Sequence, residues 1–271
     1  MIPKKSLGQH FLNNLDIVKK IIQTAEVDSS DEILEIGPGK GILTRQLISS
    51  ARKVYAVEID PQLVFFLKND LSSCRNLEII EGDILKVSFA LLPPRFKIVA
   101  NIPYQISSPL LTRLIHERVR ISSMTLMVQK EVAERLVAKP GTKAYGTLSV
   151  FIQFYASAEP AFNIAKNSFS PPPKVDSSVV KIVPLQDSRI QTLDNPFFFK
   201  FVKASFAHRR KSIRNSLKDE GFCPADIDLA FKTLDIDVKR RAETLTIEEF
   251  GMASDKLFQS QFNTKTLTPL H

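Results

Sequence analysis

The sequence predicts an α/β fold, with a mostly parallel sheet covered by helices on both faces, followed by a small all-helical domain. Three observations support this prediction. Short apolar runs alternate with segments of helical periodicity in the first half of the chain. A glycine-rich stretch, Gly37–Gly41, follows the first of these runs. After Pro184 the strand pattern stops, and the remaining sequence has helical character.

The first half of the chain is expected to contain five strands joined by helices. Helical spacing of apolar residues predicts one helix over residues 13–26 and another over Ile42–Ala51. Pro61 opens a third helix at a first-turn position, where its missing N–H costs nothing. The predicted strands are Glu32–Ile36, Lys53–Ile59, Leu77–Glu81, Lys97–Ala100 and Met124–Val128.

Two more strands are expected after a helix over Lys130–Ala138. Thr147–Tyr155 and Ser178–Val183 are rich in the β-branched and aromatic residues that favour strands. The connection between them, Ala156–Val175, contains prolines and lacks helical periodicity. Because parallel neighbours usually need a helical crossover, we expect these two strands to pair antiparallel at one edge of the sheet.

The change of character near residue 185 predicts a domain boundary. The stretch 185–194 is polar and without periodicity, so we expect a linker there and two domains, 1–184 and 185–271. In the second domain, Asn195-Pro196 predicts a helix start and Gly221 a helix end, and Thr246 with Glu249 has capping-box spacing.

Composition narrows the class of protein. The 271 residues are 44% hydrophobic and 24% charged, which is ordinary globular composition. The net charge of +8 favours an anionic partner. The two cysteines, Cys74 and Cys223, predict neither a disulfide framework nor a zinc site, and no other metal site is expected. Without a signal-like or membrane-spanning apolar run, the sequence predicts a cytoplasmic protein.

The stretch Gly37-Pro38-Gly39-Lys40-Gly41 lies where a predicted strand passes into a helix. Glycines there permit a tight turn and let a ligand approach the backbone at Gly37 and Gly39. A P-loop would need Lys and then Ser or Thr after its last glycine, and a dinucleotide site needs G-x-G-x-x-G. The spacing G-x-G-x-G leaves S-adenosyl-L-methionine as the nucleotide-like ligand, although a glycine turn without a ligand has the same pattern.

Two acidic residues support the nucleoside interpretation. Glu58 ends the second predicted strand, where α/β folds place an acid that accepts hydrogen bonds from ribose hydroxyls. Asp83 follows the third strand, where its carboxylate can accept the amino group of an adenine. Because ligands of open parallel sheets bind outside the carboxyl ends of the strands, these residues and the glycine turn are expected to share one site.

The tetrad Asn101-Ile102-Pro103-Tyr104 ends the fourth strand and indicates the acceptor. An adenine amine is a poor nucleophile because its lone pair is delocalised into the ring. An Asn side-chain oxygen and a nearby backbone carbonyl can accept its two N–H groups, and both contacts favour the tetrahedral transition state. Pro103 holds the carbonyl before it toward the site, and Tyr104 offers an aromatic face to a flipped-out base.

With these motifs, the sequence resembles the ribosomal RNA adenine N6,N6-dimethyltransferases, in particular their small-subunit (16S) members, over nearly the whole chain. The segment Lys5–Leu12 is similar to the family's opening cofactor segment, with His10 where the common form has Asn. The resemblance implies a Rossmann-like class I methyltransferase sheet and S-adenosyl-L-methionine as cofactor. It assigns the cofactor contacts to His10, Leu12, Gly37, Glu58, Asp83 and Asn101.

Two later segments also match the family. Phe169–Ser177 is similar to its substrate loop, which implies that Phe169 stacks on the target adenine opposite Tyr104; taken alone, it is a proline-rich loop before a strand. Seven basic residues and no acidic one lie between Pro196 and Lys218. Among them Arg209, Arg210 and Lys211 match the family's basic signature, and phosphate neutralisation explains this cluster better than a solvated helix face.

The resemblance implies a substrate: two adjacent adenosines near the 3′ end of 16S rRNA in the small ribosomal subunit, each receiving two methyl groups. Two alternatives remain open at this stage. One is the sister enzyme that methylates large-subunit (23S) rRNA and confers macrolide resistance, which shares the tetrad and the proline-rich loop. The other is a non-catalytic ribosome-assembly or nucleic-acid-binding factor on the same fold. Gly8-Gln9 and the basic signature favour the small-subunit enzyme, and we expect a monomer.

Overall fold

The computed structural model describes residues 3–4 and 7–265, so Lys5 and Ser6 of the opening segment lie outside the described residues. The chain folds into two compact units, residues 1–134 with 156–186 and residues 135–155 with 187–271. The predicted single boundary at 184/185 is therefore wrong for one segment, because 135–155 belongs with the C-terminal helices. Phe154, for example, packs on Phe198, with 5.0 Å between the ring centroids.

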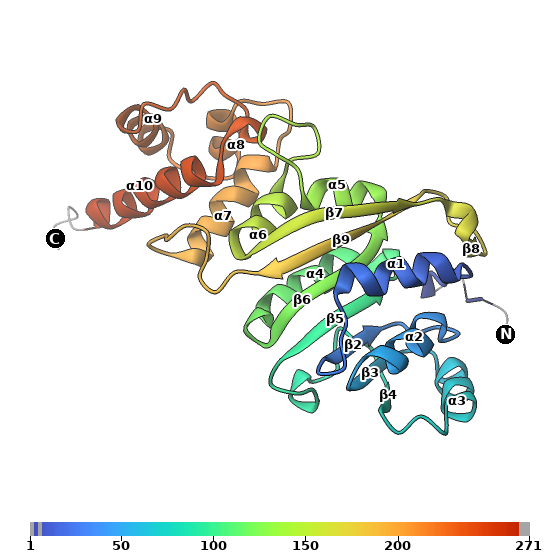
Figure 1. Ribbon diagram of the computed structural model, residues 1–271. Coiled ribbons are helices and arrows are strands. Elements are labelled where there is room, and N and C mark those ends of the chain that lie inside the picture. Colours follow the sequence, from blue (N-terminus) through green and yellow to red (C-terminus); the bar gives the residue numbers. More distant parts are fainter. Residues whose placement is uncertain (1–2, 5–6, 266–271) are drawn as a thin grey trace. The chain divides into compact units, whose positions relative to one another are not determined.

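The first unit contains a seven-stranded sheet in the order β4-β3-β2-β5-β6-β9-β7 (Figure 1). The first five strands in this order are parallel, and β9 runs antiparallel to both of its neighbours. The prediction of a mostly parallel sheet is confirmed, whereas the antiparallel pair at its edge is formed by β9 with the segment Ala156–Ile164, which was expected to be a connection, and not with Thr147–Tyr155. The strands are β2 Glu32–Ile36, β3 Lys53–Glu58, β4 Leu77–Glu81, β5 Phe96–Asn101, β6 Ile121–Gln129, β7 Ala156–Ile164 and β9 Ser177–Pro184.

Helices cover both faces of this sheet. The helices α1 Leu15–Ala25, α2 Ile42–Ser50 and α3 Pro61–Asp70 lie on one face, and α4 Ser107–His116 lies on the other (Figure 1). Right-handed crossovers explain why the helices lie on different faces. The chain moves outward from β2 to β4, which places α2 and α3 on one face, and then returns to β5 on the other side of β2, which places α4 on the other face. The strand order therefore reverses between β2 and β5, the place where open sheets bind ligands.

One segment that was predicted to be a strand is a helix. Thr147–Tyr155 forms α6, and the strand expected there is β7, the next segment of the chain. Most of α6 is buried, including Val150, Ile152 and Phe154. A helix that is apolar on most of its faces has no visible 3.6-residue period, and its packing overrides the β propensity of its residues.

The second unit consists of helices. They are α6, α7 Asn195–Phe206, α8 Ile213–Asp219, α9 Pro224–Thr233 and α10 Ile247–Lys265, and the chain passes from the first unit to the second within α5 Lys130–Leu136. The helix end at Gly221 is confirmed by its φ of 88°, and the capping box by reciprocal Thr246–Glu249 hydrogen bonds. The start of α7 is one residue earlier than predicted, because Asp194 accepts from the Phe197 N–H (2.6 Å).

A two-stranded sheet joins the N-terminal segment to the rest of the first unit. Its strands, β1 Phe11–Leu12 and β8 Phe169–Ser170, pair antiparallel, with Leu12 opposite Phe169. Both of these side chains belong to the hydrophobic core between α1, α2 and the main sheet. The pairing therefore fixes the segment from Leu7 to Leu12 beside the carboxyl ends of β2 and β5. No helix within the described part of the chain is long and apolar enough to cross a bilayer.

Candidate active site

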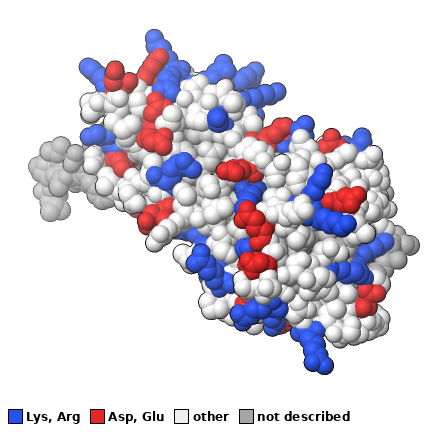
Figure 2. Space-filling view, in the orientation of Figure 1, with Lys and Arg blue, Asp and Glu red and all other residues white. Residues whose placement is uncertain are grey.

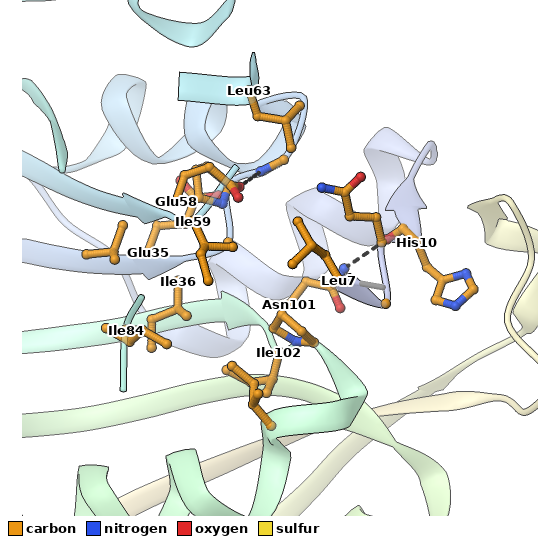
Figure 3. A pocket seen from close by; sticks show the side chains of 18 of the residues that line it. Leu7, His10, Glu35, Ile36, Glu58, Ile59, Leu63, Ile84, Asn101 and Ile102 are labelled. Atoms are coloured by element: carbon orange, nitrogen blue, oxygen red, sulfur yellow. Dashed lines mark hydrogen bonds between the residues drawn. The ribbon is translucent and has the colours of Figure 1, made fainter. Parts of the chain in front are cut away.

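A cavity of about 270 Å³ lies at the carboxyl ends of β2, β3, β4 and β5. Its walls come from five segments far apart in the sequence: the N-terminal segment 7–12, the glycine turn, and the ends of β3, β4 and β5. Figure 3 shows Glu58, Asn101 and His10 arranged along this cavity. The cavity brings together nearly all residues predicted for the cofactor and the acceptor: His10, Leu12, Gly37, Gly39, Glu58, Asp83, Asn101, Ile102, Pro103 and Tyr104.

The glycine turn needs glycine for both conformation and space. Gly39 has a φ of 59°, in the left-handed region, and a Cβ built on it would lie 3.0 Å from a ring carbon of Phe11. Gly41 has a φ of 78°, and a Cβ there would lie 2.7 Å from Leu67 Cδ2. The turn thus lets the backbone between β2 and α2 pass close under the N-terminal segment.

Glu58 is held with its carboxylate inside the cavity wall. Its side chain is buried, and its two oxygens accept hydrogen bonds from the backbone N–H groups of Gly39 (3.2 Å) and Asp60 (2.9 Å). Burial raises the pKa of Glu58, although these backbone donors oppose the rise. Each carboxylate oxygen can accept a second hydrogen bond, so Glu58 retains capacity for a pair of hydroxyls.

Asp60 does not line the cavity, but its backbone N–H supports Glu58, and no role was predicted for Asp60 from the sequence. It caps α3 through the Gln62 N–H (3.1 Å) and accepts hydrogen bonds from Lys4 Nζ (2.7 Å) and Gln9 Nε2 (3.0 Å). Burial would raise the pKa of Asp60, but these hydrogen bonds outweigh it, and the pKa lies below its usual range. Asp60 therefore ties the N-terminal segment to the end of β3. Its position before Pro61 is a helix N-cap signal that the sequence does contain.

Two further carboxyl groups line the cavity. Asp83 accepts the Leu85 N–H at 2.9 Å, which fixes the turn after β4. Glu35, on β2, is 1% exposed, and its Oε2 has no hydrogen-bond partner among the described residues. Burial raises the pKa of Glu35 to about 8, opposed by Thr44 and increased by the nearby charge of Glu58. Glu35 is therefore protonated near neutral pH, which keeps a second buried negative charge away from Glu58.

Asn101 ends β5 with its side chain toward the N-terminal segment (Figure 3). Its amide nitrogen donates to the backbone carbonyl of His10 at 3.3 Å. This contact orients the amide and leaves its oxygen without a hydrogen-bond partner among the described residues. The following residue is fixed as well, because the Ile102 N–H donates to the Met127 carbonyl (3.0 Å) and the Ile102 side chain is 1% exposed.

Tyr104 is half-buried, and its hydroxyl is hydrogen-bonded to Ser177 Oγ at 2.6 Å. Burial raises the pKa of the Tyr104 hydroxyl, opposed by the bond to Ser177. The ring of His10 stacks on the Tyr104 ring, with centroids 5.8 Å apart and a tilt of 28°. Ser177 was not singled out from the sequence, since a serine at a strand start carries no signal of this role.

Phe169 does not lie where its predicted role requires. Its side chain is 3% exposed in the core with Leu12, and it is not among the residues that line the cavity. The reason is the β1–β8 pairing, which directs Phe169 to the same side as Leu12. In this structure His10 takes the position facing Tyr104 that the prediction gives to Phe169.

The basic residues of the predicted RNA-binding cluster lie on the second unit and differ in their surroundings. Lys211 forms an ion pair with Asp219, and Arg209 donates to the backbone carbonyl of Lys143 at 2.6 Å. Arg210 is exposed. The cluster is therefore partly neutralised, with Arg210 the more available charge. Figure 2 shows that Lys and Arg side chains are interspersed with Asp and Glu over the face of the molecule in view.

The fold and the site together define a class. A parallel sheet that reverses its strand order between β2 and β5, with a glycine turn, strand-end acids and an Asn-Ile-Pro-Tyr tetrad in one cavity, is that of a Rossmann-like class I methyltransferase. Residues 3–257 match the family model of the ribosomal RNA adenine dimethylases, and the chain belongs to this family. The resemblance stated from the sequence is confirmed.

Individual relatives agree with this assignment. The chain is 41% identical over 257 residues to the ribosomal RNA small subunit methyltransferase A of Clostridium botulinum, covering 94% of each chain. The crystal structure of a dimethyladenosine transferase from Plasmodium falciparum is 33% identical, with a TM-score of 0.77 over 95% of this chain and 98% of that one. The 23S rRNA methyltransferase ErmE is 26% identical, with a TM-score of 0.72 over 92% and 100% of the chains.

Proposed function

We propose that this protein transfers methyl groups from S-adenosyl-L-methionine to the exocyclic amines of two adjacent adenosines near the 3′ end of 16S rRNA, dimethylating each. The observation that carries the proposal is the position of Asn101. Its oriented side-chain oxygen has no partner among the described residues, and it lines the same cavity as Glu58 and Asp83.

The cavity fits a nucleoside donor. Glu58 retains acceptor capacity for two ribose hydroxyls, and Asp83 offers a carboxylate for the adenine amine. Ile59 and Ile84 also line the cavity and offer apolar contact for the faces of a purine ring. His10, Leu12 and the glycines line the remainder of the wall. When bound, S-adenosyl-L-methionine supplies an electrophilic methyl group on a sulfonium.

The tetrad would activate the acceptor without a strong base. The Asn101 side-chain oxygen and the Ile102 carbonyl accept the two N–H groups of the adenine amine, and these bonds strengthen as the nitrogen becomes tetrahedral. Pro103 restricts the backbone, and Tyr104 supplies an aromatic face for the flipped base. The methylated ammonium is acidic and loses its proton readily. Since a once-methylated amine still offers one N–H, Asn101 can serve both transfers.

Several features support ribosomal RNA of the small subunit as the substrate. The Clostridium botulinum relative is named for that subunit and is more similar to this chain than the 23S enzyme ErmE is. Arg209, Arg210 and Lys211 on the helical unit, residues 187–271 with 135–155, provide positive charge for phosphates. Gly37, Glu58, Asp83 and Asn101 all line one cavity, which disfavours a purely non-catalytic factor. We further propose that the protein acts as a monomer in the cytoplasm, where ribosomal subunits assemble.

The test offers the protein tritiated S-adenosyl-L-methionine with undermethylated small subunits, large subunits or DNA as acceptors. The proposal expects label in small-subunit RNA, in N6,N6-dimethyladenosine at two adjacent positions. Label that appears in large-subunit RNA alone would instead assign the protein to the 23S enzymes. Cofactor binding without transfer to any acceptor would favour a non-catalytic role.

A further inference from the structure

The turn that follows β4 forms one wall of the cavity. Residues 82–85 line the cavity, and Figure 3 shows the side chain of Ile84 among the lining residues. The backbone carbonyl of Asp83 accepts hydrogen bonds from the N–H groups of Lys86 (2.7 Å) and Val87 (2.9 Å). A single helical turn therefore carries the carboxylate to which the proposed function assigns the adenine of the cofactor.

The carbonyl groups of this turn are held by an arginine from another element. Arg113 lies on α4, and its Nη1 and Nη2 donate to the backbone carbonyls of Leu85 and Val87, respectively. The guanidinium also lies over the Phe89 ring, with 5.0 Å between Cζ and the ring centroid. Because a guanidinium is planar and always charged, it can hold two carbonyls in a fixed geometry. The last carbonyls of a helical turn have no partner within the turn, so Arg113 acts as its C-terminal cap.

Leu85 connects Arg113 to Asp83. Its carbonyl accepts from Arg113, and its N–H donates to Asp83 Oδ1 at 2.9 Å. Val87 is tied to the cavity wall as well, because a Cβ built on Gly82 would lie 2.9 Å from Val87 Cγ2. Arg113 itself is not among the residues that line the cavity. Its guanidinium therefore fixes the Asp83 carboxylate and this wall of the cavity through the backbone of the turn.

We propose that Arg113 is a positioning residue for the base of the cofactor, because it holds the turn that carries Asp83. The inference rests on the proposed function, since it concerns the adenine of S-adenosyl-L-methionine that Asp83 would bind. Without the guanidinium, the turn must be ordered again each time the cofactor binds. Fixing the backbone of one residue costs a factor of about ten in an equilibrium constant. The loss should therefore fall on cofactor affinity and not on the transfer step.

A second arginine provides a matched control. Arg120 also donates to backbone carbonyls of the β4–β5 connection, those of Phe89, Leu92 (2.7 Å) and Pro93 (2.9 Å). None of these three residues lines the cavity. Arg113→Met and Arg120→Met each remove a guanidinium that binds carbonyls, but only Arg113→Met releases the turn after β4. Arg113→Lys is a milder variant, because one ammonium cannot hold two carbonyls as the planar guanidinium does.

Calorimetry with S-adenosyl-L-homocysteine measures cofactor affinity, and thermal denaturation measures the stability of the same variants. We expect Arg113→Met to raise Kd about tenfold and Arg113→Lys about threefold, whereas Arg120→Met should stay within about twofold of wild type even where its Tm falls as much. In transfer assays, KM for S-adenosyl-L-methionine should rise in Arg113→Met while kcat changes by less than about twofold. Because Arg113 acts through Asp83, adding Arg113→Met to Asp83→Asn should raise Kd by less than about threefold further.

A wild-type Kd in Arg113→Met, or in Arg113→Lys where the methionine variant does not fold, would overturn the inference. An equal rise of Kd in Arg113→Met and Arg120→Met would overturn it too, because Arg113 would then act only as a general support of the fold. Full additivity with Asp83→Asn would have the same consequence. A wild-type protein that binds neither S-adenosyl-L-homocysteine nor S-adenosyl-L-methionine would instead overturn the proposed function, so the two failures are distinguishable.

Discussion

Replacement of Glu58 by glutamine tests the donor half of the site. In the structure the two Glu58 oxygens accept from Gly39 N–H (3.2 Å) and Asp60 N–H (2.9 Å), and each retains one lone pair for a ribose hydroxyl. Glutamine has the same shape but a single oxygen. In Glu58→Gln the amide nitrogen must therefore face one backbone donor, and one of the two ribose hydroxyls loses its acceptor.

The expected change in cofactor affinity follows from the loss of one hydrogen bond to a ribose hydroxyl. A hydrogen bond to a charged group contributes about 1.5–3 kcal/mol, so losing one should raise the cofactor Kd by about 10- to 150-fold. Because burial raises the pKa of Glu58, wild-type affinity should also weaken as the pH falls through that raised pKa and the carboxylate is lost. The pH dependence should be absent from the variant.

Titration calorimetry with S-adenosyl-L-methionine measures both effects. The chain offers a matched control in Glu81, which lies directly opposite Glu58 in the β3–β4 pairing but is exposed and outside the cavity. Glu81→Gln should bind the cofactor like wild type. Equal dissociation constants for Glu58→Gln, Glu81→Gln and wild type would refute the assignment of Glu58 to the ribose.

Two other substitutions test the core beneath the site. Burial raises the pKa of Glu35 from 4.5 to about 8. Between these pH values the folded protein keeps a proton that the unfolded chain has lost. The contribution of Glu35 to the free energy of unfolding therefore falls as the pH rises from 4.5 to about 8. Glu35→Gln should flatten that fall in denaturant titrations across the window, and an unaltered slope would contradict the buried, protonated state. Phe169→Ala should cost about 3–5 kcal/mol of stability, because the ring is in the core. The exposed Phe65→Ala should change stability by less than about 0.5 kcal/mol, and a similarly small change for Phe169→Ala would argue against its core position.

The parts of the fold that sequence predicted best are those with a local signal. The strands β2 to β6 are short apolar runs bounded by turns, and helix ends at Gly221 and Thr246 follow from backbone conformation and capping. The prediction of a strand at Thr147–Tyr155 was wrong because a helix buried on most of its faces resembles a strand in composition. The predicted domain boundary was wrong for the same segment, because the helices on which Thr147–Tyr155 packs lie some forty residues or more further along the chain.

In the candidate site, too, the residues with a local sequence signal were predicted and those that depend on long-range contacts were not. Glu58 and Asn101 end strands, and Gly37 and Asp83 follow strands closely, so topology alone places them on one edge of the sheet. Asp60 and Ser177 act through partners distant in sequence, Lys4 and Tyr104, and no local pattern reveals such pairs. The position of Phe169 depends on its pairing opposite Leu12, a long-range register that a proline-rich loop does not specify.

We propose that Asn101 activates an adenine amine for methylation, and Asn101→Ala removes the amide oxygen on which this activation depends. The measurement is the N6,N6-dimethyladenosine content of small-subunit rRNA, by mass spectrometry, alongside the calorimetric cofactor Kd. We expect Asn101→Ala to lower kcat by about 100-fold or more and to change the cofactor Kd less than Glu58→Gln does. Dimethylation by Asn101→Ala at the wild-type rate would contradict it.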